Sequence, residues 1–486
     1  MTSDVSVKQS LPSVPRRVAI VGGGISGLAA AHRLIELEPG VTPTLFESGP
    51  RLGGVLWTVH EQGYQVEQSA DNFITTVPWG LELCKRLGLA DDLVQTNPAY
   101  RRTFVVHAGR LCRLPDGFLM MAPTQMWPLA VTPILSPLGK LRAAWEFFLP
   151  PRKDPGDESM AAFVRRRLGR EVFDRLVEPL ISAVYAADME KLSVLATLPR
   201  FRTMESQHGS LIRAMRAQMK ARKKPETQSG ARYSMFVTLR AGLTSLVEAI
   251  AARLPATSVR LNTSIDRIDR VGGAWRLHTA GGAEEFDAVI LATPSHVAGR
   301  LLSPLDAELG RDLSSVVHSG TAIVSMAYRR EQVGHRLDGM GFVVPAVENS
   351  PILAASFSSR KYVHRAPDGI ELFRVFVGGA RQAELAEMDD GRLVPLVLEE
   401  MSRLLSIKGP PIYTNTAHWP GTMPQYHVGH KELVAGIETR VASITGLELA
   451  GNAFHGVGVP NCIHSGEQAA ERTLGRPTSD GDPSEM

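Results

Sequence analysis

The chain has 486 residues and a formal net charge of +3, from 53 Lys and Arg against 50 Asp and Glu. Hydrophobic residues make up 44% and charged residues 21%, which excludes a disordered chain and provides for a sizeable buried core. The near balance of charge does not indicate nucleic-acid binding, and three widely spaced cysteines predict neither a disulfide framework nor a zinc site.

The two ends and the longest hydrophobic region predict no membrane-spanning helix. Residues 1–16 and 475–486 are polar and are interpreted as disordered tails. Six prolines divide the aromatic region between Leu114 and Pro150 into short pieces. These pieces either cap a cavity or dip into one membrane leaflet, which leaves open a peripheral contact with the inner face of the membrane. Because the widely spaced cysteines suit a reducing compartment, we expect a cytoplasmic protein.

A G-x-G-x-x-G motif at residues 22–27 joins a predicted buried strand, Arg17–Val21, to a helix-forming segment, Leu28–Leu34. Its first glycine permits a tight turn, its second lets a pyrophosphate approach the backbone, and its third lets helix and strand pack closely. The helix N-terminus then offers N–H groups and partial positive charge to phosphates. The motif therefore predicts dinucleotide binding, the alternative being a glycine turn in an unrelated α/β domain.

Glu47 ends a second predicted strand, Thr44–Glu47, and lies 20 residues after Gly27. At this spacing a carboxylate accepts hydrogen bonds from the adenosine ribose hydroxyls. Strand, motif, helix, strand and terminal Glu together predict a Rossmann-type domain.

Two further features favour FAD over NAD. The glycine pair in Arg51-Leu-Gly-Gly54 allows a chain segment to run close along an extended FAD. A strand at Asp287–Pro294 follows a small β-meander, an excursion that is typical of the FAD-binding half of two-domain flavoenzymes. The meander is predicted at residues 259–261, 264–268 and 275–279.

A third feature lies near the C-terminus, where a strand at Leu447–Ala450 precedes Gly456-Val-Gly-Val459 and a helix predicted at Cys462–Thr473. The positive end of this helix would stabilise negative charge on reduced flavin. Taken alone, Gly456 and Gly458 also fit an ordinary helix-entry turn.

With these residues, the sequence resembles the protoporphyrinogen/coproporphyrinogen oxidase family of monoamine-oxidase-like flavoenzymes, from about Val18 to Ala470. Five segments carry the resemblance, of which the last three are specific to porphyrinogen oxidases: residues 21–28, 51–54, 183–188, 423–430 and 456–463. The segment 423–430 is most similar to the bacterial branch, whose substrate is often coproporphyrinogen III. The chain departs from the family at Ala183 and Ala187, which replace Gly, and at Ser69-Ala70, which replaces Gly-Pro.

The resemblance implies a set of FAD contacts and a set of substrate contacts, with the FAD bound non-covalently. The implied FAD contacts are Gly22, Gly23, Gly24, Ile25, Ser26, Gly27, Glu47, Ser48, Arg51, Gly53, Gly54, Val55, Ser69, Ala70, Asp71, Asn72, Ile265, Trp419, Val457, Gly458 and Val459. The implied porphyrinogen contacts are Ala183, Val343, Leu353 and Phe376. Read without the resemblance, the last three are ordinary strand residues.

The activity implied is oxygen-dependent oxidation of a porphyrinogen to a porphyrin in haem biosynthesis, with release of hydrogen peroxide. The substrate, coproporphyrinogen III or protoporphyrinogen IX, carries carboxylates that need cations at the pocket rim. Arg101 and Arg102 are candidates for this role, or simply face solvent. An Arg that some family members use for a propionate is absent, since Thr75 and Thr76 stand there. No side chain is singled out as catalytic, and no metal site is predicted.

The predicted fold class is α/β, and α+β overall: a Rossmann-type FAD-binding domain of discontinuous segments, a substrate domain with a mixed sheet, and a helical insertion. The predicted FAD-binding parts are 17–75, 226–298 and 417–474, the helical part 76–225, and the substrate domain 299–416. We expect a monomer or homodimer whose partners are the porphyrinogen and molecular oxygen, with hand-over to a chelatase left open.

Two alternatives remain. One is a flavin amine oxidase or carotenoid-type desaturase on the same fold. The other is a non-catalytic protein that binds FAD and porphyrin.

Overall fold

The structure is a computed structural model that describes residues 16–119, 121–123, 126–221 and 235–478. The predictions made for residues 1–15 and 479–486 fall outside these ranges.

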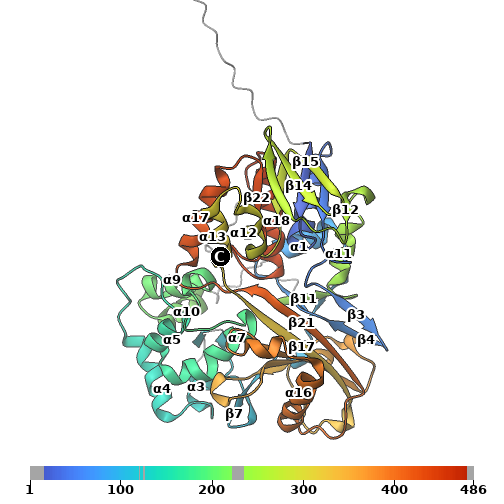
Figure 1. The fold of residues 1–486 in the computed structure, drawn as a ribbon. Helices are drawn as coiled ribbons and strands as arrows, with labels where there is room; N and C mark the ends of the chain where they lie inside the picture. The colour runs from blue at the N-terminus through green and yellow to red at the C-terminus, as the bar shows by residue number, and fades with distance from the viewer. Residues whose placement is uncertain (1–15, 120, 124–125, 222–234, 479–486) are drawn as a thin grey trace, which may run out of the picture.

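A five-stranded parallel sheet forms the core of the upper lobe in Figure 1. Its order is β12-β2-β1-β16-β22. The strands are β1 (Arg17–Val21), β2 (Thr42–Phe46), β12 (Val259–Arg260), β16 (Ala288–Leu291) and β22 (Leu447–Leu449). The strand order reverses between β1 and β16, and open α/β sheets bind ligands at the carboxyl ends of the strands beside such a reversal.

Alternate residues of this sheet face two separate cores. Val18 and Ile20 of β1 pack under the helices α1 (Ile25–Leu37), α2 (Trp79–Arg86), α11 (Thr244–Ala251) and α18 (Val459–Thr473). Ala19 and Val21 pack on the opposite face. That face is covered by β13 (Arg267–Val271), β14 (Ala274–Thr279), β15 (Gly282–Phe286), α12 (Ser295–Leu302), α13 (Ala307–Ser315) and α17 (His430–Ala442). Burial on both faces explains why the strands read as continuous apolar runs.

A seven-stranded mixed sheet forms the lower lobe, in the order β21-β17-β20-β19-β18-β7-β8. The strands are β21 (Tyr413–Pro424), β17 (His318–Arg329), β20 (Ile370–Gly378), β19 (Ile352–Phe357), β18 (Gly341–Val343), β7 (Thr103–His107) and β8 (Arg110–Arg113). All neighbours are antiparallel except β18 and β7. One face packs on α16 (Asp390–Leu405), and part of the other packs on helices of the 126–221 region.

The helices of this third region are α3 (Met126–Val131), α4 (Pro137–Ala144), α5 (Met160–Leu168), α6 (Arg170–Val172), α7 (Glu178–Tyr185), α8 (Val194–Thr197), α9 (Pro199–His208) and α10 (Leu211–Ala221). Buried ion pairs hold them together: Arg167, which is fully buried, pairs with Glu146, and Arg166 pairs with Glu158 at 2.7 Å and with Glu205. No helix in the described ranges is both long enough and apolar enough to cross a membrane.

Shorter elements complete the fold. They are β3 (Thr58–Glu61), β4 (Tyr64–Glu67), β5 (Phe73–Ile74), β6 (Leu93–Gln95), β9 (Phe118–Leu119), β10 (Ala122–Pro123), β11 (Phe236–Leu239), α14 (Ser358–Lys361) and α15 (Ala383–Ala386). Short 3₁₀ turns lie at Ala90–Asp92, Pro98–Tyr100, Trp145–Phe148, Ala256–Ser258, Arg330–Gln332, Ala346–Glu348 and Val363–Arg365, and a π-helical turn at Phe173–Val177.

The predicted fold class is confirmed, because three distant stretches of chain supply one Rossmann-type sheet and a second, mixed sheet lies beside it. The meander and two boundaries were predicted wrongly. The segment expected at 259–261 belongs to the parallel sheet as β12, which pairs with β2, and the meander consists of β13, β14 and β15. The strand expected at 264–268 begins only at Arg267, because its ladder with β14 starts at the pair Arg267 and His278. The last helix begins at Val459 rather than Cys462, because Gly458 is its extended N-cap and Pro460 is favourable in a first turn.

Candidate functional site

The loop after β1 has the shape that a dinucleotide pyrophosphate needs. A Cβ atom on Gly22 would lie 2.5 Å from the carbonyl oxygen of Ala292, and one on Gly27 would lie 2.0 Å from the carbonyl oxygen of Gly22. A Cβ atom on Gly24 would meet nothing within 4 Å. The first and third glycines thus permit close packing of the chain, while the second faces open space where a phosphate can approach.

Glu47 follows β2 and its carboxylate lies beside this loop. It accepts hydrogen bonds from the backbone N–H of Gly23 at 2.8 Å and of Gly49 at 2.7 Å. These bonds hold the carboxylate at the carboxyl edge of the sheet, next to the exposed Ser48. It is therefore placed where ribose hydroxyls bind in Rossmann-type domains.

Residues 51–55 run directly against the glycine loop. The backbone N–H of Gly53 donates to the carbonyl of Gly23 at 2.8 Å, and a Cβ atom on Gly54 would lie 3.2 Å from the Cα of Gly24. The Arg51 guanidinium donates to the carbonyl of Gly54 at 2.7 Å and so fixes the turn. The second glycine pair is therefore needed for a close approach of two backbone segments, as well as for any approach to a cofactor.

Two helices begin at this edge of the sheet, and no side chain caps either of them. The N-cap of α1 is Gly24 and the N-cap of α18 is Gly458. Uncapped N–H groups and the helix dipole attract negative charge. The two helices pack closely because α18 carries Gly466, where a Cβ atom would lie 2.1 Å from the carbonyl oxygen of Ser26.

Residues Ser69–Asn72 lie between the two lobes. The indole N–H of Trp419 donates to the carbonyl of Gln68 at 2.5 Å, and the Arg374 guanidinium donates to the carbonyl of Ser69. Both of these side chains come from the seven-stranded sheet, so that sheet holds the segment in place.

The start of α18 lies beside the same segment. A Cβ atom on Gly80 would be 3.0 Å from the ring of Phe73 and 3.3 Å from Pro460, so the two side chains meet across this glycine. The structure thus brings the predicted contacts at 69–72 and at 457–459 to one place, although nearly 400 residues separate them in the sequence.

Tyr426 and His430 fix the loop that leads into α18. The Tyr426 hydroxyl donates to the carbonyl of Asn452 at 2.5 Å and accepts from the N–H of Gly456 at 2.8 Å. The His430 ring stacks on Tyr426 with centroids 4.0 Å apart. The sequence predicts neither contact, although both residues lie within the segment 423–430 that carries the family resemblance.

A cluster of charged side chains lies behind Ser69–Asn72, and the sequence analysis missed it. Lys361 pairs with Asp71 at 3.0 Å, Arg374 lies 3.4 Å from Asp71, and Arg365 pairs with Glu67 at 2.7 Å. Burial raises the pKa of Asp71, but the charges of Lys361, Arg374 and Arg365 outweigh it and lower the pKa to about 2. A charged residue inside the apolar strand β20 is a signal that could have revealed Arg374.

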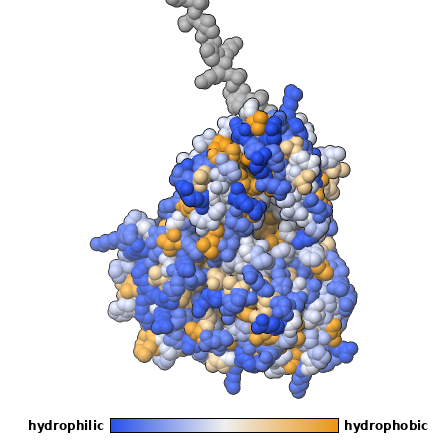
Figure 2. Space-filling view, viewed as in Figure 1, coloured by the Kyte–Doolittle hydropathy of each residue, from blue (hydrophilic) through white to orange (hydrophobic). Residues whose placement is uncertain are grey.

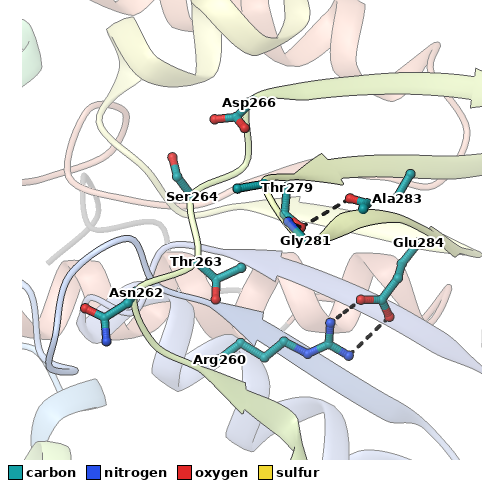
Figure 3. A pocket seen from close by; sticks show the side chains of 11 residues that line it. Arg260, Asn262, Thr263, Ser264, Asp266, Thr279, Gly281, Ala283 and Glu284 are labelled. Atoms are coloured by element: carbon teal, nitrogen blue, oxygen red, sulfur yellow. Dashed lines mark hydrogen bonds and ion pairs between the residues drawn. The ribbon is translucent and has the colours of Figure 1, made fainter.

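A pocket of about 480 Å³ opens beside the loop of Glu47 and is shown in Figure 3. The Arg260–Glu284 ion pair lies on one side, Asp266 lies on the opposite side, and Thr263 lies between them. Its lining is about equally polar and apolar, and it lies at the adenosine end of the predicted cofactor path rather than at the flavin end. Ile265, a predicted FAD contact, is only 5% exposed and does not line this pocket, although its sequence neighbours Ser264 and Asp266 do.

Three of the predicted substrate contacts gather on one face of the seven-stranded sheet. Val343 and Phe376 belong to one apolar cluster with the helical region. Leu353 lies next to the end of α7, since a Cβ atom on Gly379 would be 3.3 Å from it. Ala183 is exposed near the end of α7. Figure 2 shows the surface hollowed between the two lobes, with hydrophobic residues in the hollow.

Arg101 and Arg102 are not brought to this face by any contact in the described ranges. The Arg102 side chain is 55% exposed and lies 3.4 Å from Asp338, to which Arg113 also pairs at 2.7 Å. Arg101 is exposed beside it. Their role as carboxylate ligands stays a prediction.

The residues present fit an FAD molecule along this path. Glu47 lies at one end, open space lies at Gly24, and the glycine pair 53–54 follows. The uncapped start of α18 and Ser69–Asn72 lie at the other end. Across the described residues, no group of three or more His, Cys, Asp or Glu side chains is arranged to hold a metal ion.

Known proteins resemble the chain over nearly its whole length. The family of flavin-containing amine oxidoreductases matches residues 25–474. The chain is 35% identical to coproporphyrinogen III oxidase of Bacillus subtilis over 467 residues, covering 94% of this chain and 98% of the relative. It is 32% identical to coproporphyrinogen III oxidase of Staphylococcus aureus over 466 residues, covering 94% and 99%.

A solved structure shares the fold over the same length. It is a protein from Exiguobacterium sp. 255-15, provisionally described as a protoporphyrinogen oxidase, with 31% identity, a TM-score of 0.85, and coverage of 94% of this chain and 98% of that one. The family match and these full-length similarities establish that the chain belongs to the flavin-containing amine oxidoreductases, in the branch of the porphyrinogen oxidases, and is a flavin-dependent oxidoreductase.

Proposed function

We propose that this protein oxidises a porphyrinogen to the porphyrin in haem biosynthesis, with non-covalently bound FAD as electron acceptor and molecular oxygen as the final oxidant. Coproporphyrinogen III is the first substrate to test, because the relatives from Bacillus subtilis and Staphylococcus aureus carry that name. Protoporphyrinogen IX is the second.

One contact supports a reaction between a large apolar substrate and a flavin at this place. The Arg374 guanidinium donates to the carbonyl of Ser69 and lies 5.3 Å from the centre of the Phe376 ring. A predicted FAD contact and a predicted substrate contact therefore share one side chain. Apolar walls with few charged groups suit a tetrapyrrole, which must lie against the flavin for hydride transfer.

Bound FAD supplies a two-electron acceptor, and the protein supplies position and electrostatics. Trp419 holds the chain at Gln68, so the segment that follows is fixed against the mixed sheet. Asp71 is a poor base, because its pKa is about 2 and it is ionised at neutral pH. We therefore assign the protein's contribution to orientation of the substrate and exclusion of water rather than to proton abstraction by a named side chain.

Non-covalent attachment is supported by Cys462, which lies in the first turns of α18. Its side chain is buried, and burial raises the pKa of its thiol to about 12. Flavin attachment through sulfur requires a reactive thiolate, which this environment disfavours.

The experiment is a side-by-side turnover assay of the FAD-loaded protein with coproporphyrinogen III and protoporphyrinogen IX. Porphyrin fluorescence, oxygen uptake and peroxide are measured together. We expect porphyrin formation coupled to oxygen consumption, and faster turnover of coproporphyrinogen III. Peroxide formed with amines but not with porphyrinogens would support an amine oxidase instead. Flavin that dithionite reduces but neither porphyrinogen reduces would indicate a non-catalytic binding protein.

The exposed apolar side chains of the helical region support a peripheral membrane contact. Among residues 127–148, six large hydrophobic side chains are 56% to 78% exposed: Trp127, Val131, Leu138, Leu141, Trp145 and Phe148. They come from α3, α4 and the turn after α4, at the lower left of Figure 1, where Figure 2 shows orange side chains at the surface. Arg213 and Arg216 lie over the neighbouring Phe147 ring, and such cations favour an anionic lipid surface.

Sedimentation with vesicles tests this contact. We expect more protein to bind vesicles with phosphatidylglycerol than vesicles of phosphatidylcholine alone. The variant Leu138→Glu should release it, whereas Val363→Glu, at an exposed valine outside the patch, should not. Equal sedimentation of the wild type and Leu138→Glu would contradict the proposal.

A further inference from the structure

We propose that a buried positive charge behind Ser69–Asn72 stabilises the anionic reduced form of the bound flavin and so raises its redox potential. This proposal rests on the proposed function for the presence of the flavin. It adds three residues, Lys361, Arg365 and Arg374, that the sequence did not single out.

The charges of this cluster do not cancel. Its cations are Lys361, Arg365 and Arg374, and its anions are Glu67 and Asp71, which leaves one surplus positive charge when all five groups are ionised. Burial lowers the pKa of Lys361 and of Arg374, and the charge of Asp71 opposes this by raising both.

Two neighbours of the cluster are neutral near pH 7. Burial lowers the pKa of His364 to about 4, and burial raises the pKa of Tyr362 above its ordinary value. Arg360, the residue before Lys361, pairs with Glu371, and Arg330 lies 3.6 Å from the same carboxylate, so Glu371 already has its own counter-charges. Neither neighbour nor pair therefore removes the surplus.

The cluster is largely removed from water. The side chains of Arg374 and Arg365 are each 2% exposed and Glu67 is 1% exposed, while Lys361 and Asp71 are 14% and 15% exposed. An uncompensated buried charge is costly, because the protein interior screens it poorly and no solvent shell stabilises it. Negative charge that arrives with a bound ligand would offset this cost.

Reduced flavin is the anion that fits best. Hydride transfer gives the flavin two electrons and one proton, so the reduced ring carries one negative charge until a second proton binds. The charge appears beside Ser69–Asn72 if those residues contact the flavin as the family resemblance implies. Arg374 reaches this segment through the carbonyl of Ser69. A positive charge so placed lowers the energy of the reduced state relative to the oxidised state.

A carboxylate of the substrate fits less well. The Nη1 atom of Arg374 lies 3.4 Å from a carboxylate oxygen of Asp71, and the Nε atom has no hydrogen-bond partner in the described part of the chain; both atoms are buried by the protein itself. A side chain that grips a carboxylate must present its N–H groups to the ligand cavity. Arg374 is therefore a positioning residue that acts through its charge and through Ser69, rather than a substrate ligand.

The test measures the midpoint potential of the bound flavin and its affinity for sulfite, which adds to electron-poor flavins. For Arg374→Gln we expect a lower potential and roughly tenfold weaker sulfite binding, since one nearby charge is lost. Arg374→Lys keeps the charge and should restore most of both values. The matched control is Arg360→Gln, which removes a cation from the neighbouring ion pair and should leave both values unchanged.

Asp71→Asn provides the opposite test, because it raises the surplus by one charge. It should raise the potential and strengthen sulfite binding, a change of sign that damage to the packing does not produce. If Arg374→Gln fails to hold flavin, Asp71→Asn decides the matter: an unchanged or lowered potential would overturn the proposal.

Two other results separate the remaining explanations. One is an Arg374→Gln variant that keeps the wild-type potential and its affinity for the coproporphyrin methyl ester but loses affinity for coproporphyrin. That result would show that Arg374 binds a substrate carboxylate, and it would overturn the proposal. Wild-type protein that takes up no flavin would instead refute the proposed function on which this inference rests.

Discussion

Gly466 in α18 lies directly against the backbone of Ser26 in α1, so close that a Cβ atom on Gly466 would be 2.1 Å from the Ser26 carbonyl oxygen. The contact joins the last helix of the chain to the first, and both helices begin at the predicted cofactor site. Alignment of the two helix N-termini therefore depends on a residue without a side chain.

Gly466→Ala should separate α18 from α1 and destabilise the protein by about 1–3 kcal/mol, the usual cost of overpacking. Urea unfolding of the flavin-free protein measures the effect. Gly436→Ala is the matched control, because Gly436 lies in α17 and a Cβ atom there meets nothing within 4 Å. It should be neutral or stabilising by up to about 1 kcal/mol. Equal stability of the two variants would contradict the packing described here.

Gly24→Val should abolish retention of FAD while leaving the flavin-free fold intact. The backbone of Gly24 has φ −69° and ψ 175°, which other residues adopt readily, and the added side chain would enter the space reserved for the pyrophosphate. Absorbance of the purified protein reports bound flavin, and circular dichroism with thermal unfolding reports the fold. A yellow Gly24→Val variant would show that the cofactor does not approach this loop.

Local signals predicted one half of the site. Strand, glycine loop and helix follow one another within residues 17–37, and Glu47 lies one strand further on, so local spacing fixes their geometry. The sequence did not predict the Asp71–Lys361 ion pair, because 290 residues separate the partners and only the docking of two sheets brings them together. The same holds for Gly466 and Ser26.

The substrate side was predicted from family resemblance alone. Val343 and Phe376 look like ordinary strand residues, and nothing in a strand pattern tells which face will meet a ligand. Arg101 and Arg102 show the converse: adjacent cations are easy to notice, yet Arg102 pairs with Asp338 at the surface. Their role remains a prediction.

His430 should make the stability of the protein depend on pH. Burial lowers its pKa to about 4. Between pH 6.5 and about pH 4, His430 is therefore protonated in the unfolded chain and neutral in the folded chain. The stability is complete above pH 6.5 and is lost as the pH falls toward 4, by about 2 kcal/mol at pH 5.

The variant His430→Phe keeps a ring on Tyr426 and removes the titration. Urea unfolding between pH 7.5 and pH 5 should show a shallower loss of stability for this variant. A pH dependence as steep as that of the wild type would refute a buried neutral His430.

Cys462 should remain unmodified by maleimide in the folded protein at neutral pH, because its thiol is buried and its pKa is about 12. Cys112, which is partly exposed, is the internal comparison and should react faster. Mass spectrometry after brief labelling locates the adduct.

In the FAD-loaded protein, acid precipitation should leave all flavin in the supernatant, and flavin in the pellet would contradict non-covalent binding.

The most direct measurement is an anaerobic reaction of the FAD-loaded protein with coproporphyrinogen III. We expect the first two-electron step to bleach the yellow flavin absorption. Porphyrin fluorescence should rise only after oxygen is admitted and the flavin absorption returns, because each porphyrinogen must lose six electrons and one flavin holds two. Flavin that stays oxidised in the presence of excess coproporphyrinogen III and of protoporphyrinogen IX, but is bleached by dithionite, would contradict porphyrinogen oxidation by this protein.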